Sequence, residues 1–158
     1  MVVFSLGHMS TLATEVAKFR QWAIVRQSPD YHSDEHSHGA EWECDYPAWQ
    51  DLYAAVSSLI EAAAHRPLTT DELENMLYAL ARDNEDEVIL QRLVEFPAVA
   101  LQVVEASVSV TDADARWQSA VLAGKVGATA IVRRFLDDDA EYVRRRAGFA
   151  LQEMESRA

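Results

Sequence analysis

Cysteine is almost absent from this chain of 158 residues: Cys44 is the only one, so no disulfide bond can form within the chain. A chain without disulfides is typical of a reducing cytoplasm. Long apolar runs are also missing, and none approaches the ~20 residues that a membrane-spanning helix needs. Because the first residues lack the basic segment of a secretory signal, the sequence predicts a cytoplasmic protein that does not enter a membrane.

Basic residues are scarce relative to acidic ones, with 14 Lys and Arg against 26 Asp and Glu and a net charge of −12. The excess lies in residues 1–111, which carry 6 basic and 18 acidic side chains, whereas residues 112–158 carry 8 of each. Such a surface repels phosphate backbones, which disfavours nucleic acid as a ligand, and it attracts a basic protein. The alternative is that the negative charge only keeps the protein soluble.

Patterns that favour β-strands are rare as well. Alternation of apolar and polar residues is nearly absent, whereas apolar residues recur at helical spacing along most of the chain. At this length we expect one all-α domain, residues 1–158. The predicted helices cover residues 10–27, 47–65, a segment from 69, then 84–95, 97–105, a segment from 112 or 114 to 124, then 126–136 and a segment from 139.

Residues that cap or open helices set several of these boundaries. Ser10 is expected to cap the first helix, and Pro47 fits the first turn of the second. Thr69 and Glu72 form a capping box, and Asn84 opens a comparable motif. The last helix carries one apolar stripe that is predicted to pack on the preceding helix: Val143, Ala147, Ala150, Leu151 and Met154.

Two segments repeat at an offset of 28 residues. Asp114-Ala-Arg116-Trp-Gln-Ser119-Ala120 aligns with Tyr142-Val-Arg144-Arg-Arg-Ala147-Gly148, and Asp83-Asn-Glu-Asp-Glu87-Val88 falls one period earlier with a weaker match. Short connections between helices predict antiparallel neighbours. A period of about 28–30 residues with a two-helix unit predicts an α-solenoid, in which each unit buries its apolar stripe against the next.

These segments resemble consecutive HEAT-like repeats, with an acidic residue, then Val-Arg, then small residues down the second helix; Ala115 replaces the usual Val. The resemblance covers residues 69–156, and residues 39–60 look like the N-terminal cap of small bacterial HEAT-like proteins. It implies a right-handed α-solenoid of about three helical hairpins (67–158) behind an N-terminal helical cap (10–66, including the polar loop 28–46). It also implies that Arg116 and Arg144 pair with the turn aspartate of an adjacent repeat. Some relatives of this kind sit beside toxin genes as immunity proteins.

The segment from His32 to Cys44 has metal-ligand character, because His32, His36 and His38 offer imidazoles that zinc or nickel accepts. The spacing matches no structural zinc template, and a solvated polar loop is the simpler interpretation. The thiolate of Cys44 is disfavoured by the carboxylates beside it, and no nucleophile motif is present. The sequence therefore predicts no catalytic residue, no metal and no cofactor, with a metal protein or enzyme based on this loop as an alternative.

Acidic clusters are the main candidate binding residues. Those at helix starts should align on one edge of a solenoid as a continuous acidic ridge, although carboxylates at helix N-termini also serve the helix dipole. A further cluster mixes carboxylates with aromatic residues, which suits an interface, or else its aromatic rings hold the segment onto the first repeat. The predicted partner-binding residues are Glu41, Trp42, Glu43, Asp45, Asp83, Glu85, Asp86, Glu87, Asp137 and Asp138.

From these features we expect a non-catalytic protein-binding module that is monomeric when it is not bound to its partner. The specific hypothesis is an immunity-type inhibitor that covers a basic partner such as a nuclease toxin. A generic regulatory scaffold or adaptor is the alternative within the same class.

Overall fold

The computed structural model describes residues 9–26 and 41–158, and within these residues the chain is all-helical, as the periodicity predicts. This part of the chain contains no strand. The elements in chain order are α1 (Leu12–Arg26), the 3-10 helix η3 (Glu41–Asp45), α2 (Trp49–Ala63), α3 (Thr70–Arg82), α4 (Val88–Val94), α5 (Pro97–Ser107), α6 (Ala113–Lys125), α7 (Thr129–Phe135) and α8 (Glu141–Arg157).

The capping box at the start of α3 is confirmed. The Thr69 hydroxyl accepts the backbone N–H of Glu72 at 3.2 Å, and the Glu72 carboxylate accepts the backbone N–H of Thr69 at 2.9 Å. At α1 the prediction is off by one residue, because the Thr11 hydroxyl accepts the backbone N–H of Thr14. Ser10 instead hydrogen-bonds the side chain of Glu15.

The cap predicted for α4 is wrong. Helix α4 begins at Val88, and Glu87 before it has a left-handed backbone with φ of 52°. This conformation turns the chain back toward the end of α3, so the Asp83 carboxylate accepts the backbone N–H of Ile89 at 2.8 Å. Asp83 therefore takes the role that the sequence gave to Asn84. Helix α2 also starts later than expected, two residues after Pro47.

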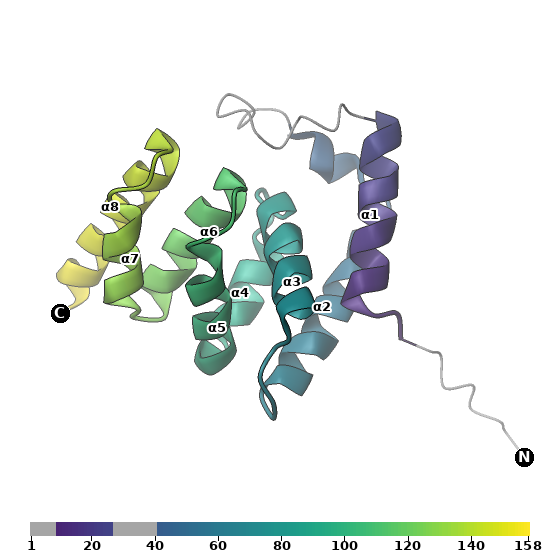
Figure 1. The fold of residues 1–158 in the computed structure, drawn as a ribbon, viewed down its shortest axis with the longest axis horizontal. Helices are drawn as coiled ribbons and strands as arrows, with labels where there is room; N and C mark the ends of the chain where they lie inside the picture. The colour runs from purple at the N-terminus through teal and green to yellow at the C-terminus, as the bar shows by residue number, and fades with distance from the viewer. Residues whose placement is uncertain (1–8, 27–40) are drawn as a thin grey trace, which may run out of the picture.

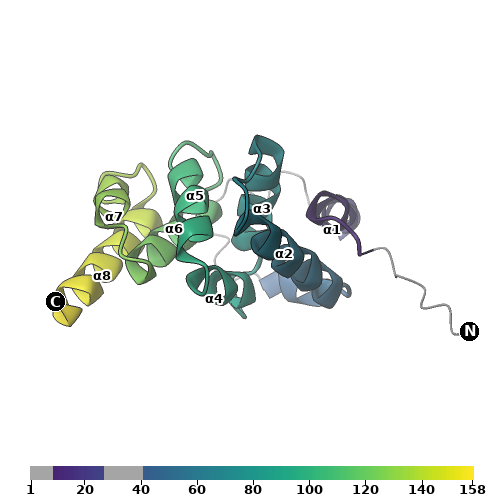
Figure 2. The same ribbon diagram turned by 90° about the horizontal axis from the view of Figure 1, so that it is seen from below.

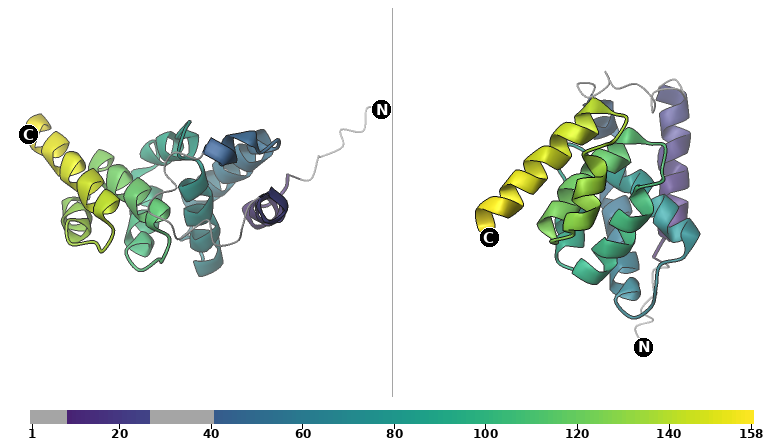
Figure 3. Two further views of the ribbon diagram at one scale, coloured as in Figure 1. Left: turned by 90° about the horizontal axis from the view of Figure 1, so that it is seen from above. Right: turned by 60° about the vertical axis from the view of Figure 1, so that its left-hand side comes forward.

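The helices follow one another along the long axis in chain order, from α1 at one end to α8 at the other (Figure 1). Figures 2 and 3 show the same succession from other sides. Helix α1 packs on α2 and α3, α3 packs on α5 and α6, and α6 packs on α7 and α8. Buried side chains from all eight helices form one continuous core. None of the helices in residues 9–26 and 41–158 has the length and apolarity of a membrane span.

An aromatic cluster fastens η3 and the start of α2 to α1. The ring of Phe19, which is fully buried, lies 4.5 Å from that of Tyr46, 5.4 Å from that of Trp49 and 6.0 Å from that of Trp42. Trp22 stacks on Trp42 with ring centroids 5.6 Å apart. Tilted and edge-to-face pairs of this kind add to the free energy of burial. The cluster fixes where η3 presents its carboxylates.

Helices α6 and α8 make the closest approach in the C-terminal half. The ring centroids of Trp117 and Tyr142 lie 5.4 Å apart, edge to face. A Cβ added at Gly124 would lie 2.9 Å from the Cβ of Ala150, so only glycine fits this contact. The apolar stripe of α8 therefore packs on α6 as well as on α7, and its last members Leu151 and Met154 are only partly buried.

Candidate partner-binding surface

Several helix ends meet along the upper edge of the molecule in Figure 1, where η3, the α3–α4 turn, the start of α6 and the α7–α8 turn lie. These segments carry most of the predicted binding residues. We call this surface the acidic edge; its carboxylates belong to Glu43, Asp45, Asp83, Glu85, Asp86, Glu87, Asp112, Asp114, Asp137, Asp138 and Asp139.

Arg82, the last residue of α3, joins the α3–α4 turn to the start of α6. Its side chain is 0% exposed and its guanidinium lies 2.6 Å from the carboxylate of Asp112 and 3.8 Å from that of Asp114. Asp112 also caps α6 by accepting the backbone N–H of Asp114. The Arg82 guanidinium lies 5.4 Å from the centre of the Tyr78 ring. A buried cation and two carboxylates thus tie the end of α3 to the start of α6.

Arg116 makes the corresponding connection from α6 to the α7–α8 turn. Its guanidinium contacts Asp138 at 2.8 and 3.0 Å and Asp139 at 2.7 Å, which confirms the expected pairing with the turn aspartates that follow. It also donates to the carbonyls of residues 110 and 111, six and five residues before it. The pairing expected of Arg144 is not found among the described residues; Arg144 instead donates to carbonyls at the same separation, those of residues 138 and 139. The sequence repeat therefore corresponds to a repeated contact.

Asp83 is buried, with 3% of the residue exposed. Its carboxylate accepts the Tyr53 hydroxyl and the backbone N–H of Ile89, each at 2.8 Å, and its carbonyl accepts the Gln118 amide at 3.2 Å. Burial raises the pKa of Asp83 to about 6, although these hydrogen bonds oppose the rise. Burial and the bond to Asp83 also raise the pKa of Tyr53. Asp83 therefore holds α2, α4 and α6 together.

Trp42 and Glu43 lie inside the molecule, with 8% and 2% of each residue exposed. Trp42 belongs to the aromatic cluster, which is the locking role that the sequence left open, and it does not stand on the surface as an anchor. The backbone carbonyl of Glu43 accepts the indole N–H of Trp49 at 2.8 Å. Burial raises the pKa of Glu43 to about 7, and its own backbone N–H and the charge of Arg82 oppose this.

The structure brings two of the predicted clusters together around one small pocket of about 60 Å³. Glu43 and Cys44 of η3 face Asp83, Glu85 and Asp86 of the α3–α4 turn, although about forty residues separate them in sequence. The remaining lining residues are Trp49, Tyr53, Arg82 and Asn84.

The other predicted residues have different surroundings. Asp45 and Asp137 are exposed, and Glu87 is partly buried. Asp138 forms an ion pair with Arg116. The side chain of Glu41 and the histidines of residues 32–38 lie outside the described residues. Glu85 and Asp86 are exposed at the pocket, so they, with Asp45 and Asp137, are the predicted residues that lie on the surface.

Sequence reasoning missed Arg82 and Tyr53, which complete the network under this pocket. Arg82 ends a helix, a position where a basic residue is expected for the helix dipole alone. Tyr53 reads as one member of an apolar stripe, since its hydroxyl partner is 30 residues away. The one available signal was Arg116: a second arginine with aspartates downstream suggests the same contact one repeat earlier.

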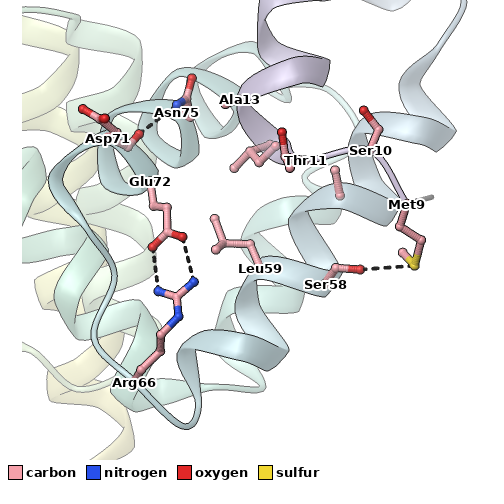
Figure 4. A pocket seen from close by; sticks show the side chains of 12 residues that line it. Met9, Ser10, Thr11, Ala13, Ser58, Leu59, Arg66, Asp71, Glu72 and Asn75 are labelled. Atoms are coloured by element: carbon pink, nitrogen blue, oxygen red, sulfur yellow. Dashed lines mark hydrogen bonds and ion pairs between the residues drawn. The ribbon is translucent and has the colours of Figure 1, made fainter.

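A larger pocket of about 420 Å³ lies at the other side of the helices, between the starts of α1 and α3 and the middle of α2 (Figure 4). Its volume is in the range of small-molecule sites. Two of its three charged side chains neutralise each other, because Arg66 binds Glu72 through two hydrogen bonds of 2.7 and 2.8 Å; the third is Asp71. None of the predicted binding residues lines it.

In residues 9–26 and 41–158 no group of three or more His, Cys, Asp and Glu side chains is arranged to hold a metal ion. Comparisons of the chain with protein-family models, with curated proteins and with solved structures find no match.

Proposed function

We propose that the protein is a non-catalytic binding module that recognises a basic protein partner through its acidic edge. The observation that carries this proposal is the convergence of Glu43, Asp83, Glu85 and Asp86 on one pocket from two distant segments. Helix capping does not require such a convergence. Glu85 and Asp86 cap no helix, since Asp83 satisfies the start of α4.

Electrostatic steering gives the exposed carboxylates a function. Residues 1–111 carry the whole net charge of −12, and six of the eleven carboxylates of the acidic edge lie in that part of the chain. A concentrated negative field raises the rate at which a basic protein associates, and salt screens it beyond a Debye length of ~8 Å at physiological ionic strength.

We further propose that α3 to α8 form an α-solenoid of about three HEAT-like hairpins, capped by α1 and α2. The repeated carbonyl contacts of Arg116 and Arg144 support this. The succession of helices along the long axis also agrees with it (Figure 1). Stacked hairpins place equivalent turns on one side, which explains why the acidic turns share an edge.

The most specific form of the proposal is an immunity-type inhibitor that covers a basic toxin domain. High negative charge in a small chain favours this form. The basic surface of a nuclease binds the negative phosphates of nucleic acid, and an acidic inhibitor can bind the same surface. A regulatory scaffold uses the same surface on a different partner. A toxin gene next to the gene of this protein would favour the inhibitor.

We expect the double variant Glu85→Gln, Asp86→Asn to associate with the partner about 3–10 times more slowly than the wild type, because two exposed charges leave the steering field. The partner is first captured at low salt on the immobilised protein and identified by mass spectrometry. Association rates are then measured by surface plasmon resonance at about 0.05 and 0.5 M salt.

The matched control is Glu105→Gln, Glu155→Gln, which removes the same charge from exposed positions on α5 and α8. We expect its association rate to stay within about twofold of the wild type. The proposal would be contradicted by an acidic partner. It would also be contradicted by an association rate that changes neither with salt nor with the substitutions at Glu85 and Asp86.

A further inference from the structure

Glu43 is a buried carboxylate whose binding capacity is incompletely used. It lines the small pocket between η3 and the α3–α4 turn, and only 2% of it is exposed. Its Oε2 atom accepts no hydrogen bond from the described residues. A buried polar atom in this condition costs free energy, and native proteins retain such atoms mostly where a ligand, an ion or water completes them.

The surroundings of Glu43 select for positive charge. Glu85 and Asp86 stand exposed at the same pocket, and Asp83 forms part of its lining. The one cation in the lining, Arg82, forms its ion pairs with Asp112 and Asp114 on α6, although its charge also acts on Glu43. The pocket thus combines four carboxylates with one cation that pairs elsewhere.

We propose that this pocket receives the ammonium or guanidinium end of a lysine or arginine side chain from the basic partner. This inference rests on the proposed function and names the contact that gives it specificity. The stem of such a side chain would lie along Trp49 and Tyr53, whose rings line the pocket and stack with centroids 5.3 Å apart. Cations are attracted to aromatic faces as well as to carboxylates.

A cationic side chain fits the pocket better than a metal ion does. A volume of about 60 Å³ holds one small polar group. The carboxylates around it do not form a metal-binding group of three or more ligands within the described part of the chain. An ammonium or guanidinium donates several hydrogen bonds in different directions, so it tolerates carboxylates that are not placed at metal-ligand distances.

The raised pKa of Glu43 is what we expect of a buried carboxylate that has no cation bound to it. The titratable and charged groups near it are Tyr78, Arg82 and Asp83 on or at the end of α3, Glu85 and Asp86 in the next turn, Tyr53 on α2, Asp114 on α6, and its neighbour Cys44. A bound cation would offset the burial that raises this pKa to about 7. Binding should therefore weaken as the pH falls below about 7, where Glu43 gains a proton.

The test is a titration of the ¹⁵N-labelled protein with tetralysine and tetra-arginine peptides, followed by NMR. We expect saturable chemical-shift changes at the amides of residues 41–46 and 83–89. Glu43→Gln should raise the dissociation constant at least about fivefold. Glu105→Gln, the same chemical change at an exposed site on α5, should leave it within about twofold. Tetra(acetyllysine), which has no charged side chain, should not bind.

The stability of Glu43→Gln separates a binding role from a structural one. The folded-state pKa of about 7 lies above the ordinary 4.5, so the stability due to protonated Glu43 is lost as pH rises through about 7. Glutamine removes that cost, and we expect its melting temperature at pH 8 to rise by about 2–6 °C. A structural carboxylate would give a lower melting temperature, and this result would overturn the proposal.

Other outcomes also decide the matter. Equal weakening by Glu43→Gln and Glu105→Gln would overturn the pocket while leaving a general acidic surface intact. Displacement of tetralysine by micromolar Mg²⁺ would assign the pocket to a metal ion. If Glu43→Gln does not fold, Asp86→Asn at the exposed rim must weaken tetralysine binding, or the pocket is not the site. If tetralysine does not bind but a captured basic partner does, only this inference fails.

Discussion

Replacing Arg82 with alanine is expected to lower the free energy of unfolding by about 3–5 kcal/mol, the usual cost of breaking a buried ion pair. The guanidinium is 0% exposed and lies 2.6 Å from the carboxylate of Asp112, with Asp114 at 3.8 Å. Alanine would leave both carboxylates in a poorly solvated contact between α3 and α6 without their cation. The measurement is urea denaturation followed by circular dichroism.

Arg92→Ala is the matched control. Arg92 also contacts two carboxylates, those of Glu61 and Glu95, but its side chain is 29% exposed and its partners are mostly exposed. Water and salt screen such pairs, so we expect a loss below about 1 kcal/mol. Equal losses for the two arginines would show that burial of Arg82 does not matter and would contradict the described network.

Replacing Asp83 with alanine is expected to cost about 2–4 kcal/mol, because two donors lose their acceptor at once. The buried backbone N–H of Ile89 and the hydroxyl of Tyr53 both bond the Asp83 carboxylate at 2.8 Å. Asn84→Ala should cost less than about 0.5 kcal/mol, since Asn84 does not cap α4. Both are measured by urea denaturation.

A larger loss for Asn84→Ala than for Asp83→Ala would restore the cap that the sequence predicts and remove Asp83 from the network. The expected loss also has a practical consequence. Asp83 cannot serve as a simple surface charge in binding experiments, because its replacement changes the fold under the pocket. Glu85 and Asp86, whose side chains make no such bonds with the described residues, are the suitable positions for substitution.

Local signals in the sequence predict the helices well. The Thr69 capping box, Pro97 at the start of α5 and the stripe along α8 each depend on residues close in the chain. Boundaries fail where the capping group arrives from a distance, as with Asp83 and the left-handed Glu87. The spacing rules for helix caps consider residues that adjoin the first turn. They therefore do not find the Asp83 carboxylate, which reaches the start of α4 across a turn that reverses the chain.

The site is predicted in part, for a related reason. The carboxylates of residues 41–45 and 83–87 are evident as charge clusters, but their burial is not. Glu43 and Asp83 are buried because η3 is fastened to α1 by Phe19 and because α6 covers the end of α3 through Gln118. Those contacts join segments far apart in sequence, so a charge pattern alone assigns Glu43 and Asp83 to the surface with their exposed neighbours.

Hydrogen–deuterium exchange on the complex with the captured partner tests the location of binding most directly. We predict slower exchange at amides of residues 41–46 and 84–88, which include or adjoin the pocket of the acidic edge, at a salt concentration that preserves the complex. Exchange at residues 9–13 and 55–59, around the apolar pocket of Figure 4, should not change. Protection confined to that apolar pocket, with none at the acidic edge, would contradict the account.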